Sequence, residues 1–239
     1  MPQQIDWSVL WRPPFGEMVV GAVLTTLELS LVSWAFALIL GVAIGMARAA
    51  PLRAARLLAT AYVELFRNIP LLVQLFFVYY VLPRLLPEPL RQGLFRLGWE
   101  PASAVLTLAL YTSAKIAEHV RSGLNAVGRP VQLGALSTGL TWLQAQRHVV
   151  APLVLRTIVP SLASEFVTVF KSSSLAMTVG VVETSYLTQQ LGLQTFHWIE
   201  ANTMGIAVYL VCAWSVALLM SLVERWSRVP GVLGRRTLP

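Results

Sequence analysis

The chain has 239 residues, of which 56% are hydrophobic and only 12% are charged. Charged residues make up about a quarter of an ordinary soluble domain, so this composition excludes that class and predicts a chain surrounded largely by lipid. The net charge of +7 comes from arginines placed between apolar runs, which favours a role in membrane orientation over nucleic-acid binding. The single cysteine, Cys212, excludes an internal disulfide.

Apolar runs that could cross a bilayer occur five times along the chain. A membrane-spanning helix needs about 20 mostly apolar residues. The runs are residues 19–47, 57–82, 101–117, 153–182 and 201–223. We therefore expect an all-α integral membrane protein with about five transmembrane helices, which form a single domain over residues 1–239.

The arginines lie mostly on one side of this arrangement. Eleven fall in the segments 48–56, 118–156 and 224–239, whereas four fall in the other segments that flank the runs. Because positive charge is retained on the cytoplasmic side of a membrane, we expect a periplasmic N-terminus and a cytoplasmic C-terminus.

The first run contains a pair of glycines at helical spacing, Gly41 and Gly45. Small residues four positions apart share one helix face and allow a second helix to approach closely. Glycine is also simply common in membrane helices, and this explanation stays equally open.

Charged residues in the second and third runs have spacings that suit ion pairs within a helix. Glu64 and Arg67 are three residues apart, which favours an internal ion pair over contact with a ligand. Lys115 precedes Glu118 by the same distance, and an intrahelical pair is again the simpler expectation.

The fourth run is long and interrupted. Pro160 removes an internal hydrogen bond of a helix, and a polar cluster, residues 171–174, follows it with the sequence Lys-Ser-Ser-Ser. We expect a kinked or broken helix here, because irregular backbone in a membrane is tolerated where it is buried in protein or lines a wet cavity. Lys171 is the leading candidate to line a path for a polar substrate. A lysine paired with Glu165, or with a carboxylate of another helix, is an equally good explanation.

Residues 127–152, which we call the elbow, form the most distinctive segment between the runs. Gly139 is suited to end a short helix in a left-handed cap, and Pro152 is not expected to continue a preceding helix. These features predict a compact structure that projects into the cytoplasm, although a simple connecting loop would have the same composition.

The elbow is similar to the cytoplasmic motif of permease subunits of bacterial ABC importers for polar amino acids. That motif has an acidic residue and two alanines before a glycine, and further on an isoleucine before a leucine and a proline. At its spacing this chain has Leu133, Gly134, Ala135, Gly139, Val149, Ala151 and Pro152. Leu133 stands in place of the acidic residue, and Ala151 in place of the leucine. The resemblance continues through residues 62–74, 118–121, 164–174 and 222–231, and is strongest to permeases of glutamate/aspartate systems.

This resemblance implies the type I ABC importer permease fold in the bacterial inner membrane. It implies a coupling helix that docks on an ATPase and includes Leu133, Gly134, Ala135, Gly139 and Pro152. The residues expected along the substrate path are Lys171, Ser172, Ser173 and Ser174, together with Glu64, Arg67 and Asn68 of the second run.

The sequence contains no G-x-x-x-x-G-K-[ST] loop, which would bind nucleotide phosphates. We therefore expect a transporter subunit without an enzymatic site or a cofactor of its own, and ATP and magnesium bound by a partner ATPase. The resemblance implies a complex with two ATP-binding subunits, a second homologous permease or a copy of this chain, and a periplasmic solute-binding protein. Lipid is an expected partner, and nucleic acid is not.

Glutamate and aspartate are the substrates that the resemblance favours. Glutamine, histidine or arginine is the alternative, because the solute-binding protein can set the choice. A stand-alone secondary transporter is less well supported, since the sequence shows no repeated halves, and a membrane enzyme would need a nucleophile and a base on facing helices. The three histidines, His119, His148 and His197, lack the spacing of a metal site.

Overall fold

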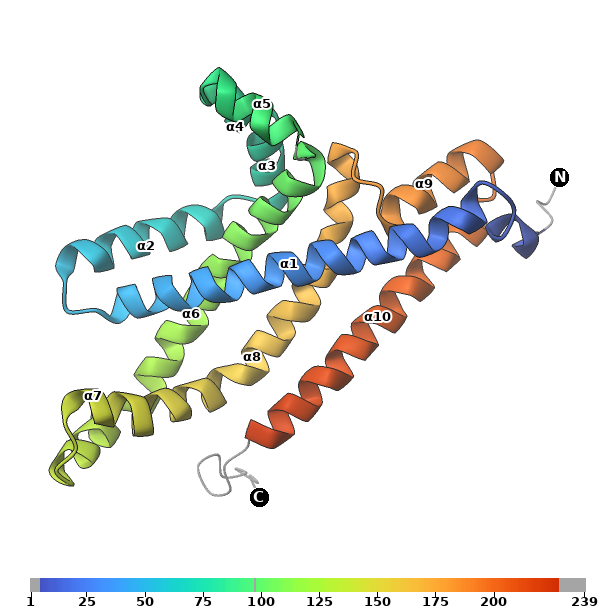
Figure 1. Cartoon of the computed structure of the whole chain (residues 1–239). Coiled ribbons are helices and arrows are strands. Elements are labelled where there is room, and N and C mark those ends of the chain that lie inside the picture. The colour runs from blue at the N-terminus through green and yellow to red at the C-terminus, as the bar shows by residue number, and fades with distance from the viewer. Residues whose placement is uncertain (1–4, 97, 228–239) are drawn as a thin grey trace.

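The computed structural model describes residues 5–96 and 98–227, and within these all regular structure is helical. In chain order the elements are η1 (Trp7–Leu10), α1 (Phe15–Ala49), α2 (Arg53–Asn68), α3 (Leu71–Phe76), η2 (Phe77–Val81), α4 (Leu82–Leu85), α5 (Glu88–Arg96), α6 (Trp99–Ser137), α7 (Trp142–Ala145), η3 (Gln146–Val150), α8 (Ala151–Ser172), η4 (Ser173–Val179), α9 (Thr184–Thr195) and α10 (Trp198–Ser227). Figure 1 shows α1 crossing α6 and α8 at the centre of the bundle. The predicted all-α class is confirmed.

Helices α1 and α6 pack unusually closely, because glycines of α1 face α6. A β-carbon added at Gly41 would lie 2.6 Å from Cβ of Ile116, and one added at Gly45 would lie 2.6 Å from Cβ of Val120. Both α6 side chains belong to an apolar cluster that also includes Trp34 of α1 and residues of α8. The close approach predicted from the glycine spacing is confirmed.

Helix α6 is the central helix, and small polar residues make up much of its buried face. Ser103, Thr107, Thr112 and Ser113 are buried there. The hydroxyls of Ser103, Thr107 and Ser113 donate to carbonyl oxygens one turn earlier at 2.7–2.8 Å, so they are satisfied without a partner from another helix. A helix shielded in this way does not need an apolar surface.

Length and composition give three or four candidate spans among the described residues. Three stretches of the described residues are long and apolar enough to cross a membrane, namely α1, residues 142–179 and residues 198–223. A fourth is the bent pair of residues 53–68 and 71–85, if it is counted as one span. The predicted third span, residues 101–117, lies within α6 and is helical as expected. It is covered by neighbouring helices and does not stand out as a span.

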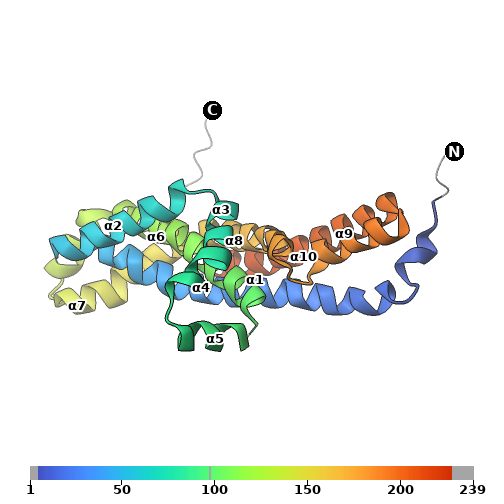
Figure 2. The same ribbon diagram turned by 90° about the horizontal axis from the view of Figure 1, so that it is seen from above.

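The second run is not one straight helix, and the prediction of a single helix over residues 57–82 is wrong. Its two parts meet at an angle of 105°, and Figure 2 shows α3 and α4 turning away from α2. Pro70 lacks the amide hydrogen that would bond to the carbonyl of Phe66. The side-chain amide of Gln74 donates to this carbonyl instead, at 2.7 Å, and to that of Ile69 at 2.8 Å.

The fourth run is broken at a different place from the one that its proline suggested. Helix α8 continues through Pro160, and the change to a 3₁₀ helix occurs at Ser173, within the polar cluster. Pro152 also lies inside a continuous helical stretch, residues 142–179, so the expectation that it would not continue a helix is wrong. The π-helical η3 ends at Val150, and Pro152 follows it at the second residue of α8.

The two ends of the described chain lie on opposite sides of the bundle. The backbone amide of Asp6 donates to the carboxylate of Glu200 at 2.7 Å, so α1 and α10 start at the same end and run toward the opposite one (Figure 1). This arrangement agrees with an odd number of crossings. The predicted cytoplasmic C-terminal residues 228–239 lie outside the described part of the chain.

Candidate functional site

A cavity of about 640 Å³, lined mostly by apolar surface, lies where the end of α8 meets η4, α9 and α10. Its lining mixes apolar residues of η4 and α10 with polar side chains from all four elements. The polar lining residues are Lys171, Ser174, Ser185, Thr188, Gln189, Asn202 and Tyr209. Among the described residues that line it, Lys171 is the only one with a charged side chain.

Lys171 occupies the end of α8, next to the change to 3₁₀ geometry. Its side chain is exposed, and no carboxylate in the described part of the chain forms an ion pair with it. The alternative pairing with Glu165 is not found, because Glu165 contacts Lys115 at 3.4 Å and His119 at 3.4 Å. A cation is therefore available at the cavity.

The three serines after Lys171 do not act as one group. Ser174 lines the cavity, and its hydroxyl donates to the carbonyl of Lys171 at 2.8 Å. Ser173 is fully buried, and its hydroxyl donates to the carbonyl of Phe170 at 2.7 Å. Ser172 is half-buried and is not part of the lining. Of the three serines, only Ser174 lines the cavity; that the cluster faces a substrate path stays a prediction.

The other side of the cavity comprises residues that the sequence analysis missed. Tyr209 and Ser185 line it, and the hydroxyl of Tyr209 donates to the buried carboxylate of Glu183 at 2.6 Å. Glu183 precedes α9, and its carboxylate accepts from the amide of Tyr186 at 2.9 Å. The signal available in the sequence was a carboxylate followed by Thr-Ser directly after the fourth run, residues 153–182.

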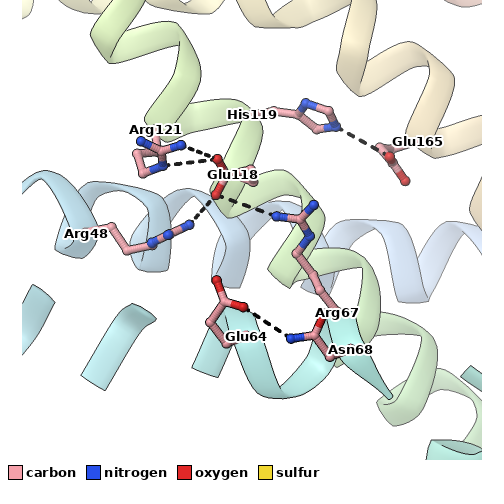
Figure 3. A network of polar contacts seen from close by, with 8 residues as sticks. All are labelled: Arg48, Glu64, Arg67, Asn68, Glu118, His119, Arg121 and Glu165. Atoms are coloured by element: carbon pink, nitrogen blue, oxygen red, sulfur yellow. Dashed lines mark hydrogen bonds and ion pairs between the residues drawn. The ribbon is translucent and has the colours of Figure 1, made fainter. Parts of the chain in front are cut away.

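The charged residues of the second run lie at a separate site, where α1, α2 and α6 cross (Figure 3). Glu118 accepts hydrogen bonds from Arg48 and Arg121, and Arg67 lies 3.8 Å from the same carboxylate. The predicted ion pair between Glu64 and Arg67 is therefore wrong. The predicted pair between Lys115 and Glu118 is also wrong, because the carboxylate of Glu118 contacts three arginines instead.

Glu64, Arg67 and Asn68 do not line the cavity. Asn68 donates to Glu64 at 3.2 Å on the exposed face of α2.

Glu118 lies just beyond the predicted span 101–117. Hydrogen bonds from Arg121, followed by those from Arg48, lower the pKa of Glu118 to about 2. The cluster is a charged junction between three helices.

The elbow contains a short helix, residues 129–137, set off from the rest of α6 by Gly128. The backbone of Gly128 has a φ of 71°, which breaks the helix, and Pro130 then falls in the first turn of the segment that follows. Gly139 has a φ of 87°, and its amide donates to the carbonyl of Leu136 at 3.0 Å. The predicted left-handed cap is confirmed.

The elbow presents apolar side chains to the exterior of the chain. Leu133 is 62% exposed, Trp142 is 61% exposed and Leu143 is 69% exposed. Ala135 is buried, and Gly134 and Gly139 have open space where a β-carbon would be. Pro152 is half-buried at the start of α8. Exposed apolar groups on a cluster of short helices are typical of a docking surface.

Comparison with known proteins gives a consistent result along almost the whole chain. The family model described as "Binding-protein-dependent transport system inner membrane component" matches residues 18–229. The glutamate/aspartate import permease protein GltJ of Escherichia coli (strain K12) is 36% identical, over 96% of this chain and 98% of GltJ. The nopaline transport system permease protein NocM of Agrobacterium fabrum (strain C58 / ATCC 33970) is 32% identical, over 87% of each chain. A crystal structure of an amino acid ABC transporter with histidines is similar at a TM-score of 0.79 and 26% identity, over 94% of this chain and 100% of that chain. The chain therefore belongs to the family of inner-membrane components of binding-protein-dependent transport systems, as a permease subunit of an amino-acid ABC importer.

Proposed function

We propose that this permease carries glutamate and aspartate across the bacterial inner membrane. The similarity to GltJ supports this choice, because it covers nearly the full length of both chains. Other polar amino acids are the alternative substrates, because the names of similar proteins refer to nopaline and to histidines.

The observation that carries the proposal is the charge of the cavity. Its lining holds the ammonium of Lys171 and no carboxylate among the described residues, so it attracts a substrate with a net negative charge. An ionisable group within a membrane-spanning segment is costly unless it faces a cavity or a partner, and Lys171 faces the cavity. The side-chain amides of Gln189 and Asn202 are neutral donors on the same lining. They would suit the second carboxylate that distinguishes an acidic amino acid.

We further propose that a separate pair of ATPase subunits binds ATP and magnesium and docks on the elbow. The exposed Leu133, Trp142 and Leu143 support this part of the proposal, since they would be covered by such a partner. The remaining members of the complex would be a second permease, either homologous or identical, and a periplasmic solute-binding protein. ATP-driven closure of the ATPases would then move the elbow and change the side from which the cavity is reached, which is a two-state equilibrium shifted by a ligand.

Uptake by the reconstituted complex tests the substrate. The complex would be purified from its native membrane, placed in proteoliposomes with ATP inside, and supplied with its solute-binding protein and labelled amino acids. We expect ATP-dependent uptake of glutamate and aspartate that excess unlabelled glutamine, histidine or arginine does not compete away. Preferential uptake of one of the latter would refute the acidic substrate, and uptake without an ATPase subunit would refute the ABC mechanism.

A further inference from the structure

A carboxylate is buried directly behind one wall of the cavity. Glu183 is completely inaccessible to solvent, and it has no cationic partner in the part of the chain that the structure describes. Its oxygens accept hydrogen bonds from the hydroxyl of Tyr209 at 2.6 Å and the amide of Tyr186 at 2.9 Å, with a longer contact from Thr26 at 3.4 Å. A buried carboxylate is costly even when it is hydrogen-bonded, so its position calls for an explanation.

Glu183 determines which way the hydroxyl groups of the cavity wall point. Tyr209 has one hydroxyl hydrogen, and Glu183 accepts it. The hydroxyl of Ser185 donates its own hydrogen to the oxygen of Tyr209, at 3.0 Å. Both hydroxyl hydrogens are thus used within the protein, and the wall formed by Ser185 and Tyr209 offers the cavity oxygen lone pairs.

The position of Glu183 is itself fixed by α1. The amide of Thr184 donates to the hydroxyl oxygen of Thr26 at 3.1 Å, and the hydroxyl oxygens of Thr26 and Thr184 are 2.8 Å apart. The side chains of Thr26, Glu183 and Thr184 are all buried. The start of α9 is therefore anchored, and the relay from Ser185 through Tyr209 to Glu183 has one arrangement.

The lining of the cavity consequently combines a cation with hydrogen-bond acceptors. Lys171 contributes a positive charge to its lining, whereas Ser185 and Tyr209 contribute hydroxyl oxygens whose own hydrogens are donated within the protein, in front of the buried Glu183. An α-amino acid is a zwitterion with the same two features. We propose that Ser185 and Tyr209 accept hydrogen bonds from the α-ammonium of the transported amino acid, and that Glu183 is the residue that positions them. This inference rests on the proposed function of the cavity as the substrate path.

Binding measurements on matched compounds test the ammonium subsite. The permease–ATPase complex would be placed in nanodiscs without solute-binding protein, and affinities would be measured for three pairs: glutamate and glutarate, aspartate and succinate, glutamine and glutaramate. The second member of each pair lacks only the α-ammonium. We expect the wild-type complex to prefer the amino acid, and Tyr209→Phe to weaken amino-acid binding about tenfold, the size of one hydrogen bond to a charged group. Affinity for the deaminated compound should stay unchanged.

Two further variants and a control make the result specific. Glu183→Gln should reduce the same preference, because the amide can donate to Tyr209 and release its hydroxyl hydrogen toward the cavity. Ser185→Ala provides the same readout if Tyr209→Phe does not assemble. Tyr186→Phe is the control, since Tyr186 bonds to Glu183 through its backbone amide and does not line the cavity.

The possible outcomes separate the two proposals. The ammonium subsite is overturned if the wild-type complex binds no amino acid more tightly than its deaminated counterpart. It is also overturned if Tyr209→Phe and Ser185→Ala weaken the binding of both members of a pair equally. If the glutamine pair alone shows the preference, the acidic substrate fails while the subsite stands. If the glutamate and aspartate pairs show it and lose it in the variants, both proposals are supported.

Discussion

The ammonium of Lys115 in α6 lies 3.4 Å from the carboxylate of Glu165 in α8. The other oxygen of Glu165 is 3.4 Å from Nε2 of His119, and the ammonium of Lys115 also lies 4.8 Å from the centre of the Tyr111 ring. The pair therefore joins two helices of the core, in a region that water reaches only partly.

Removing one partner of this pair should destabilise the protein. In Glu165→Leu the ammonium of Lys115 loses its carboxylate, and we expect a loss of about 2 kcal/mol, less than for a fully buried pair because both side chains keep some exposure. Thermal unfolding of the purified complex would measure it. The double variant Lys115→Met with Glu165→Leu should recover part of the loss. Additive losses in the double variant would show that the two charges do not interact.

Stability at low pH should depend on Glu118. Its pKa is lowered from 4.5 to about 2, chiefly by the hydrogen bond from Arg121. A carboxyl with a lowered pKa stabilises the folded state fully above its ordinary pKa, and this contribution is lost as the pH falls toward the folded value. We expect Glu118→Gln to lower the melting temperature at neutral pH, and the difference from wild type to shrink between pH 4.5 and pH 2. A difference that stays constant over this range would contradict the charged junction.

Predictions that depend on the overall apolar composition and on the conformational freedom of glycine are confirmed by the structure, whereas the helix predicted over residues 57–82 from hydrophobic length is wrong. The helical class, the close approach at Gly41 and the left-handed cap at Gly139 follow from residues whose effect is local. The sequence also resembles its family over most of its length, and that resemblance identified the elbow.

Predictions that depend on which partner a charged residue selects are mostly wrong. Spacing along a helix suggested Lys115 with Glu118, but a residue of another helix, Glu165, lies 3.4 Å from Lys115. Tertiary proximity decides such pairs, and spacing carries no information about it. For the same reason the relay from Glu183 to Tyr209 was not predicted, since its members are 26 positions apart.

Packing at Gly41 should be sensitive to a single added carbon. A β-carbon there would lie 2.6 Å from Cβ of Ile116 and 2.8 Å from the carbonyl oxygen of Ser113, and a backbone atom cannot rotate away. We expect Gly41→Ala to cost about 1–3 kcal/mol, as overpacking in a core does. Gly21→Ala in the same helix is the matched control, because no atom lies within 4 Å of its added carbon. Melting temperatures of the two variants would be compared, and equal values would refute the tight α1–α6 contact.

Transport should depend on the charge of Lys171. Lys171→Met keeps the length of the side chain and removes the charge, so an anionic substrate loses its attraction to the cavity. We expect uptake of glutamate to fall at least about tenfold, the effect of losing one charged hydrogen bond, while the complex still assembles in size-exclusion chromatography. Lys171→Arg should keep more activity than Lys171→Met. Normal glutamate uptake by Lys171→Met would remove this residue from the substrate path.

Coupling to the ATPase can be tested at a glycine where a side chain would meet no other atom of the described chain. Gly134 lies in the helix of the elbow with no atom within 4 Å of an added β-carbon, so Gly134→Arg should fold normally and act only on a partner. We expect substrate-stimulated ATP hydrolysis and uptake to fall together, because the arginine would keep the elbow from seating on the ATPase.

Gly93→Arg is the control for bulk and charge. Gly93 is also helical and equally open, but it lies in α5, away from the elbow (Figure 1). Its variant should keep both hydrolysis and uptake, which would be measured on the same proteoliposomes as for Gly134→Arg. If Gly134→Arg also keeps both activities, the ATPase does not dock on this face of the elbow. If Gly93→Arg loses them as well, the effect of Gly134→Arg cannot be assigned to docking, because an added arginine then disturbs the complex wherever it is placed.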